Sequence, residues 1–232
     1  MKNIPSTAAI ILAAGSSSRM GGGRHKLLLP LDDRPVLAHV LDATLASQAR
    51  PIILVLGHQA EQVRTAIATH PEIAIVENTD YLQGMSTSMR VGLEVLLGTR
   101  HPQTGHLQGV SPHAREPGKQ VSWPDSALIM LGDQPLITAQ IIDTLIQTWQ
   151  TTGKHIVAPL YEGRRGNPTL FAASLFPELL EVTGDEGGRR VVERHRQELA
   201  TVELGDAVAN YDMDTWEAYQ QVVEMWQKKK TV

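Results

Sequence analysis

Residues 8–26 read AAIILAAGSSSRMGGGRHK, a short apolar run that leads into a loop of small residues ending in cations. The run lacks polar alternation, which is typical of a strand buried on both faces of a sheet. With Lys2 before it, the stretch 8–14 also imitates a secretory signal, but it continues into GSSSR rather than into a cleavage site. We therefore interpret residues 8–13 as a buried first strand.

The rest of the chain repeats this pattern of apolar runs separated by amphipathic segments. Further runs typical of buried strands occur at residues 52–56, 73–76, 127–131 and 156–159. Apolar residues at three- and four-residue spacing predict helices over residues 35–47, 59–69, 86–97 and 138–148. Strands that alternate with helices are joined by right-handed crossovers, so we predict an α/β fold with a mostly parallel central sheet.

Two segments depart from this alternation. Glycines and a proline within residues 161–169 predict a turn or a small hairpin that extends the sheet. Residues 99–124 are rich in Pro, Gly and His and have little apolar periodicity, which predicts a mobile loop inserted into the domain. The length of 232 residues fits a single domain, 1–232.

The composition excludes several classes of function. Apolar residues make up 42% of the chain, which is enough for a packed core. The net charge of −4 argues against a nucleic-acid partner or a polybasic membrane anchor, and no apolar run approaches the about 20 residues of a membrane span. Because the chain has no Cys, it has no disulfide framework, thiolate nucleophile or zinc–thiolate site.

The loop after the first strand has the chemistry of an anion-binding site. Small residues at 13–18 let the backbone approach a ligand closely, and free N–H groups in such a loop can surround an anion. Arg19 and Lys26 add positive charges that suit phosphate oxygens. Neither a Walker loop nor a dinucleotide fingerprint is present, so the residues alone also allow a flexible glycine-rich turn with two exposed cations.

This loop resembles the signature of nucleotidyltransferases that consist of one α/β domain, and similar motifs follow through most of the chain. In chain order they are LLLP (27–30), VLGH (55–58), GMSTS (84–88), LGDQP (131–135), GRRGNP (163–168), GDEG (184–187) and DMDT (212–215). The ordered set is most similar to the molybdopterin (molybdenum cofactor) cytidylyltransferase family of the glycosyltransferase-A-like superfamily. The resemblance implies a three-layer, Rossmann-like nucleotidyltransferase fold.

The resemblance also implies where a nucleotide binds, with Arg19, Lys26 and Asp133 as catalytic residues. The residues implied to bind the nucleotide lie in the first loop and at the start of the third helix: Leu12, Ala13, Ala14, Gly15, Arg19, Lys26, Gly84, Met85 and Ser86. On their own, the hydroxyl residues within 84–88 are equally typical of a helix cap.

Asp133 is the first candidate metal ligand. It follows the predicted strand 127–131, at the carboxyl end where an open sheet binds its ligands. One or two carboxylates together with substrate phosphates are sufficient for Mg²⁺, although an aspartate here also suits a turn. The resemblance implies that Asp133 and Asp214 hold Mg²⁺, with Asp212 as the second choice to Asp214.

The resemblance places the acceptor-binding residues at Asn167, Asp185, Glu186 and Arg189. Asn167 departs from the family, which usually has His there, and the connection 99–124 is longer than usual. We expect a cytoplasmic enzyme that transfers CMP from CTP to the phosphate of a molybdopterin-type acceptor and releases pyrophosphate. A molybdenum hydroxylase that receives the product is an expected partner.

Other functions stay open. The acceptor could be another phosphorylated molecule, such as a sugar, choline or methylerythritol phosphate, and the nucleotide could be GTP. Guanylyl-transferring relatives usually have Gly where Ala14 stands. A non-catalytic carrier of a pterin cofactor would need no pyrophosphate release, and a nicotinamide-dependent reductase would need the dinucleotide fingerprint that is missing.

Overall fold

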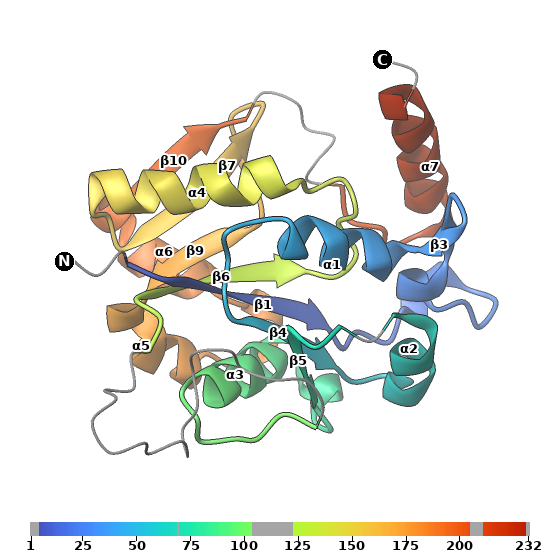
Figure 1. Ribbon diagram of the computed structural model, residues 1–232, viewed down its shortest axis with the longest axis horizontal. Helices are drawn as coiled ribbons and strands as arrows, with labels where there is room; N and C mark the ends of the chain where they lie inside the picture. Colours follow the sequence, from blue (N-terminus) through green and yellow to red (C-terminus); the bar gives the residue numbers. More distant parts are fainter. Residues whose placement is uncertain (1–4, 69, 104–122, 205–210, 231–232) are drawn as a thin grey trace.

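A mostly parallel sheet runs through the middle of the computed structural model, which describes residues 5–68, 70–103, 123–204 and 211–230 (Figure 1). The strand order is β10-β7-β9-β6-β1-β4-β5, with β8 paired to β7. The strands are β1 (Thr7–Ala13), β4 (Ile52–Leu56), β5 (Ile73–Glu77), β6 (Ser126–Leu131), β7 (Ile156–Tyr161), β8 (Arg164–Arg165), β9 (Thr169–Ala172) and β10 (Leu199–Glu203). β1 pairs in parallel with both β4 and β6, whereas β9 is antiparallel to β6 and β7. The predicted α/β class with a mostly parallel sheet is therefore confirmed.

Helices cover both faces of this sheet and complete three layers (Figure 1). They are α1 (Val36–Leu45), α2 (Ala60–Ala66), α3 (Met85–Leu96), α4 (Ala139–Thr152), α5 (Phe176–Glu181), α6 (Arg189–Arg194) and α7 (Trp216–Lys230). One hydrophobic core joins the sheet to α1, α2 and α4, and a second core on the other face joins it to α3, α5 and α6. Successive side chains of a strand point to opposite faces, so Ile11 packs in the first core and Ile10 in the second.

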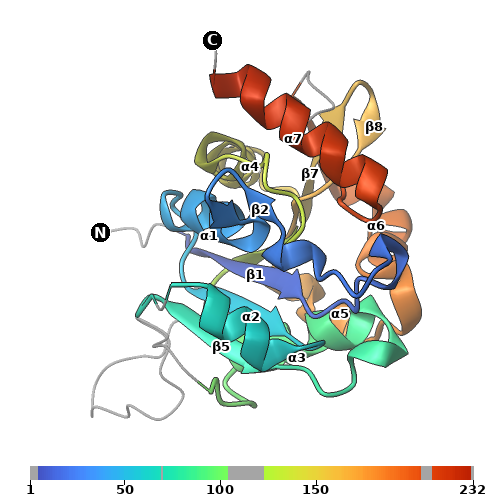
Figure 2. The same cartoon turned by 90° about the vertical axis from the view of Figure 1, so that its right-hand side faces the viewer.

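The seventh helix lies outside these layers, at the end of the molecule where β1 ends (Figure 2). It packs on a small antiparallel pair, β2 (Pro30–Leu31) and β3 (Arg34–Pro35), through a third core that includes Met213, Tyr219 and Val222. The Tyr219 hydroxyl donates to the carbonyl of Pro30 at 2.6 Å. This packing holds the segment before α7, which contains Asp212 and Asp214, beside the loop that follows β1.

The predicted elements differ from the observed ones mainly at their ends. The helix predicted over 138–148 runs from Ala139 to Thr152, because the Thr138 side chain accepts the Ile141 N–H and Gly153 ends the helix in the left-handed conformation. The helix predicted over 59–69 ends at Ala66, where Ile67 becomes extended and is buried in the first core. The short elements after residue 168 were not predicted from the sequence.

The turn predicted within 161–169 is present as the hairpin of β7 and β8. Glu162 and Gly163 both have positive φ, at 50° and 73°, as a two-residue hairpin turn requires. Of the loop predicted over 99–124, residues 99–103 and 123–124 contain neither helix nor strand. Residues 104–122 lie outside the described residues. Within the described part of the chain, no helix is both long and apolar enough to cross a membrane.

Candidate active site

A pocket of about 360 Å³ lies at the carboxyl end of β1, the end that faces the viewer in Figure 2. Open α/β sheets bind ligands at this edge. The sequence-predicted residues that line the pocket are Leu12, Ala13, Ala14, Gly15, Arg19, Lys26, Gly84, Met85, Asp133, Asp185 and Asp214. Tyr81, Leu82 and Ser88 line it as well and were not predicted. Most of the predicted nucleotide residues and both predicted metal ligands therefore share one pocket.

The loop after β1 is held against the end of β4 by close backbone packing. The backbone N–H of His58 donates to the carbonyl of Ala14 at 3.1 Å. A Cβ on Gly57 would lie only 2.7 Å from the Cβ of Ala14, so this approach requires glycine at position 57. Ser17 has a φ of 54°, and its hydroxyl accepts the Lys26 N–H at 3.1 Å. The small residues thus bring both ends of the loop to the pocket.

The Lys26 ammonium lies between two carboxylates. It donates to Asp133 Oδ2 and, at 2.7 Å, to Asp214 Oδ1. The guanidinium of Arg19 contacts the other oxygen of Asp214 at 2.8 Å. Asp133 is buried and Lys26 is mostly buried, whereas 71% of the Arg19 side chain is exposed. The catalytic and metal-ligand residues expected from the resemblance therefore form one network of alternating charge.

Burial and charge act against each other on Lys26. Desolvation by itself would lower the pKa of Lys26, but the charges and hydrogen bonds of Asp133 and Asp214 outweigh it and leave the pKa raised. Burial lowers the pKa of the neighbouring His25, which favours the neutral imidazole. Lys26 is therefore a permanent cation beside a neutral histidine at neutral pH.

Asp212 differs from the other two aspartates in the pocket. Its carboxylate accepts from the Gln134 side-chain amide at 2.7 Å and has no bond to Lys26 among those of the described residues. Desolvation by the surrounding protein and repulsion from Asp133 raise the pKa of Asp212 to about 6, although the residue as a whole is open to solvent.

Asp133 and Asp214 are the residues that could hold a metal. Their oxygens converge on one positive charge, the Lys26 ammonium. A metal ion bound by both carboxylates would take a similar position. Within the described residues, no group of three or more His, Cys, Asp or Glu is arranged to enclose a metal ion. Mg²⁺ is typically held by one or two carboxylates together with substrate phosphates, so this pair of hard oxygen donors fits Mg²⁺ bound along with a nucleotide.

A second pocket of about 170 Å³ adjoins the first, and the two share Met85, Leu131 and Asp185 as wall residues. All four predicted acceptor residues line this second pocket: Asn167, Asp185, Glu186 and Arg189. Arg165 on β8 lines it too and was not predicted. The cations among the residues that line this pocket are Arg165 and Arg189. The neighbouring Arg190 forms an ion pair with Glu186.

Ser86, by contrast, does not line either pocket. It is 1% exposed on the inner side of α3, and Ser88 takes the place at the pocket wall. The periodicity of the helix explains this difference between Ser86 and Ser88. The helix α3 begins at Met85, and residues three apart in a helix lie on the same face. Met85 and Ser88 therefore face the pocket, whereas Ser86 shares its face with the buried Met89. Knowing where the helix begins would have identified Ser88.

A family model described as the MobA-like NTP transferase domain matches residues 9–199, a range that includes the loop after β1, Lys26, Asp133 and the second pocket. The chain belongs to this family. The membership confirms the resemblance to nucleotidyltransferases and their fold. The roles of the individual site residues stay predictions, including those of Asp133 within the matched range and Asp214 beyond it.

Two curated relatives of this MobA-like domain differ in how much of their length it covers. The molybdenum cofactor cytidylyltransferase of Escherichia coli is 28% identical over 89% of this chain and 90% of its own length. The bifunctional protein GlmU of Pelobacter propionicus is 29% identical over 84% of this chain. The chain spans only about a third of that protein's length, and about a quarter of the GlmU of Sinorhizobium fredii.

Solved structures agree with the family. The crystal structure of Rv0371c from Mycobacterium tuberculosis superposes with a TM-score of 0.73 and is 27% identical, covering 95% of this chain and 98% of that one. A complex of the same protein with manganese superposes with a TM-score of 0.69, covering 94% of this chain. A related structure therefore contains manganese.

Proposed function

We propose that the chain is a cytoplasmic, Mg²⁺-dependent nucleotidyltransferase that moves CMP from CTP to the phosphate of a molybdopterin-type acceptor and releases pyrophosphate. The observation that carries the proposal is the Lys26 ammonium between Asp133 and Asp214 in a pocket at the end of β1. The similarity to the E. coli molybdenum cofactor cytidylyltransferase supports the choice of substrates, because it extends over nearly the whole of both chains.

The residues of the pocket suit this reaction. Phosphoryl chemistry depends mainly on positioning and on neutralising charge, and Lys26 and Arg19 provide two cations on one side of the pocket. Asp133 and Asp214 would hold Mg²⁺, which when bound neutralises charge on the nucleotide phosphates. Lys26 would then exchange its carboxylate partners for phosphate oxygens. No general base is needed, because an acceptor phosphate with a second pKa near about 6 is ionised at neutral pH.

The second pocket would hold the acceptor. Arg165 and Arg189 line it and suit a phosphate, and its shared wall with the first pocket would bring the acceptor phosphate toward the nucleotide. A molybdenum hydroxylase would receive the product. The single domain would span residues 1–232, with 99–124 as an insertion.

A second candidate differs only in the acceptor. Asn167, the residue that departs from the usual His of the cytidylyltransferase family, lies in the wall of the second pocket. The departure therefore falls where the acceptor would be recognised, and it favours a test with other phosphorylated acceptors, including sugar, choline and methylerythritol phosphates.

Pyrophosphate release tests the proposal. The protein would be mixed with Mg²⁺, each nucleoside triphosphate in turn and a molybdopterin acceptor, and pyrophosphate would be measured against the acceptor-free reaction. We expect release with CTP and its loss in Asp133→Asn. Release with CTP only when another phosphorylated acceptor is supplied would establish the second candidate. No release with any pair of substrates would contradict both and favour a non-catalytic carrier.

A further inference from the structure

The loop that contains Asp185 also contacts the start of α3, a hundred residues earlier in the chain. Asp185 Oδ1 accepts the backbone N–H of Met85 at 3.1 Å. The first N–H groups of a helix have no partner within the helix, and a carboxylate that accepts one of them is a helix cap. The Ncap residue of α3 is Gly84, which has no side chain to serve as the cap. Asp185, which lines both pockets, supplies the missing oxygen.

Two close approaches of the backbone, at Gly84 and Gly187, accompany the hydrogen bond between Asp185 and Met85. A Cβ on Gly84 would lie 2.6 Å from the carbonyl carbon of Gly184, and the φ of Gly84 is +109°, so both the space and the backbone require glycine. A Cβ on Gly187 would lie 3.1 Å from the sulfur of Met85. The loop 184–187 and the segment 84–85 therefore pack directly against each other at three points.

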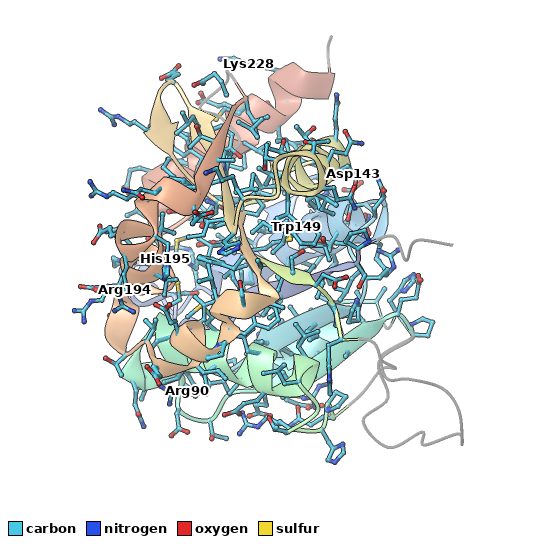
Figure 3. All side chains as sticks on the ribbon, turned by 90° about the vertical axis from the view of Figure 1, so that its left-hand side faces the viewer. Arg90, Asp143, Trp149, Arg194, His195 and Lys228 are labelled. Atoms are coloured by element: carbon cyan, nitrogen blue, oxygen red, sulfur yellow. The ribbon has the colours of Figure 1, made fainter. Side chains whose placement is uncertain are left out.

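The packing determines the shape of the nucleotide pocket. Gly84, Met85 and Ser88 line that pocket, and all three lie in or before the first turn of α3. Further along α3, Arg90 donates to the carbonyls of Leu180 and Val182, at 3.0 and 3.2 Å, so the helix body has its own attachment (Figure 3). The end of the first turn is attached as well, because the Asn78 side-chain amide donates to the hydroxyls of Thr87 and Ser88 at 2.8 and 2.9 Å. Its beginning, at Met85, is held by Asp185.

We propose that Asp185 is a positioning residue for the nucleotide: its carboxylate caps α3 and fixes Met85, the first residue of the helix, in the wall that the two pockets share. This role goes beyond acceptor binding, and its effect on the reaction rests on the proposed function. It requires an oxygen acceptor at position 185 but no negative charge. A residue that acted on the acceptor or on a metal through its charge would require the charge.

Two substitutions separate these roles. Asp185→Asn keeps an oxygen that can accept the Met85 N–H and removes the charge, whereas Asp185→Ala removes both. Asp143→Ala is the matched control. Asp143, on α4 (Figure 3), also accepts a backbone N–H, that of Gln48 at 2.8 Å, and it lines neither pocket. A further variant, Gly84→Ala, disturbs the packing of segment 84–85 against the loop 184–187 through a substitution in segment 84–85.

The first measurement needs no nucleotide. Hydrogen exchange at the Met85 amide, followed by NMR on the full chain, should become about three- to tenfold faster in Asp185→Ala, a range typical of losing a helix cap. It should stay within about twofold of the wild type in Asp185→Asn and Asp143→Ala. Unchanged exchange in Asp185→Ala would overturn the proposal, whatever the enzyme's reaction proves to be.

The second measurement is the Kd for CTP with Mg²⁺ and without acceptor. We expect the Kd to rise about three- to tenfold in Asp185→Ala and to stay near the wild-type value in Asp185→Asn and Asp143→Ala. Gly84→Ala should raise the Kd, and its effect should be less than additive with that of Asp185→Ala, since both disturb one contact. Equal weakening by Asn and Ala at position 185, or additive effects, would overturn the proposal. Failure of the wild type to bind CTP would instead contradict the proposed function, and the triphosphate that does bind would then serve as the probe.

Discussion

The two pockets are built from different parts of the sheet. The larger one lies at the end of the parallel strand β1, and its central ammonium and carboxylates are largely buried and paired with each other. The smaller one lies beside the antiparallel strand β9, and the arginines that line it, Arg165 and Arg189, are exposed. Buried paired charges are held in place by their surroundings, whereas exposed cations interact weakly and are screened by salt.

This difference indicates a division of labour. The chemistry common to nucleotidyl transfer would depend on the rigid, charged pocket. The choice of acceptor would depend on the open pocket, whose walls come from a hairpin and a short loop. Substitutions in the first pocket should therefore affect turnover, and substitutions in the second should affect acceptor affinity.

The largest expected effect comes from Lys26. Lys26→Ala should lower kcat by about 100- to 1000-fold, the usual cost of removing one preorganised donor, and should weaken CTP binding far less. Steady-state kinetics and a CTP titration would measure both quantities. Lys154→Ala is the control, because Lys154 donates to the carbonyl of Gln197 away from the pocket. A loss of turnover below tenfold in a folded Lys26→Ala protein would remove Lys26 from the catalytic residues and leave it as a structural partner of Asp133 and Asp214.

The metal ligands should come next. Asp133→Asn removes an anionic oxygen donor, so the Mg²⁺ concentration for half-maximal activity should rise at least about tenfold while the fold is kept. Asp214→Asn should behave similarly and Asp212→Asn less severely. A Mg²⁺ titration of activity for each variant would check this order. An unchanged Mg²⁺ dependence in both Asp133→Asn and Asp214→Asn would remove them as ligands.

Base choice should show a smaller effect. We expect kcat/KM for CTP to exceed that for GTP by at least about tenfold, since one-ring and two-ring bases differ in size within the same pocket. Ala14→Gly should relax this preference only in part, because the Ala14 methyl packs toward Gly57. Parallel kinetics with the two nucleotides would measure it. Comparable kcat/KM values would contradict the cytidylyl assignment but not the nucleotidyltransferase assignment.

Substitutions in the second pocket should affect acceptor binding more than turnover. Arg189→Ala should raise the KM for the acceptor by about tenfold and leave kcat and the KM for CTP within about twofold, because an exposed arginine contributes to binding rather than to the transition state. The effect should shrink as salt is added. A fall in kcat as large as that of Lys26→Ala would abolish the proposed division between the pockets.

The smallest expected effect comes from the contact between α5 and α6, the helix that begins at Arg189 of the second pocket. His195, just after α6, contacts Glu178 on α5 at 2.7 Å, and Arg194 lies beside it (Figure 3). The hydrogen bond from His195 lowers the pKa of Glu178 from its ordinary value of 4.5. The stabilisation is therefore present above that value and is lost as the pH falls through the lower pKa of the folded state. Glu178→Gln should lower Tm at pH 7 by at most about 3 °C, and the difference should vanish once the pH is below the lowered pKa of Glu178. A difference independent of pH would contradict this.

The sequence predicted the parallel half of the molecule well. The runs around β1, β4, β5 and β6 are apolar on both faces, so their composition alone marks buried strands. It did not predict β9, β10 or the short helices α5 and α6. No residue of β10 is fully buried, so its sequence has no apolar run, whereas β9 has only four residues and each helix only six, too few to show a helical period.

The candidate site shows the same limit. The residues of the first loop could be assigned because they are adjacent in the sequence. The contact of Asp133 with Lys26 joins positions 107 residues apart, and that of Asp185 with Met85 joins positions 100 apart. Only the resemblance placed these residues in one site, and it gave no sign that Asp185 caps α3. Arg165 was missed because the predicted turn within 161–169 did not give the pairing of β8 with β7 that places Arg165 at the second pocket.

The most direct test of the assignment of the first pocket to CTP and Mg²⁺ is a crystal structure of the chain with both bound. We expect the metal at about 2.1 Å from carboxylate oxygens of Asp133 and Asp214, with the Lys26 ammonium moved onto the triphosphate and the second pocket free of nucleotide. A metal more than about 3 Å from both carboxylates, or CTP seated in the second pocket, would contradict it.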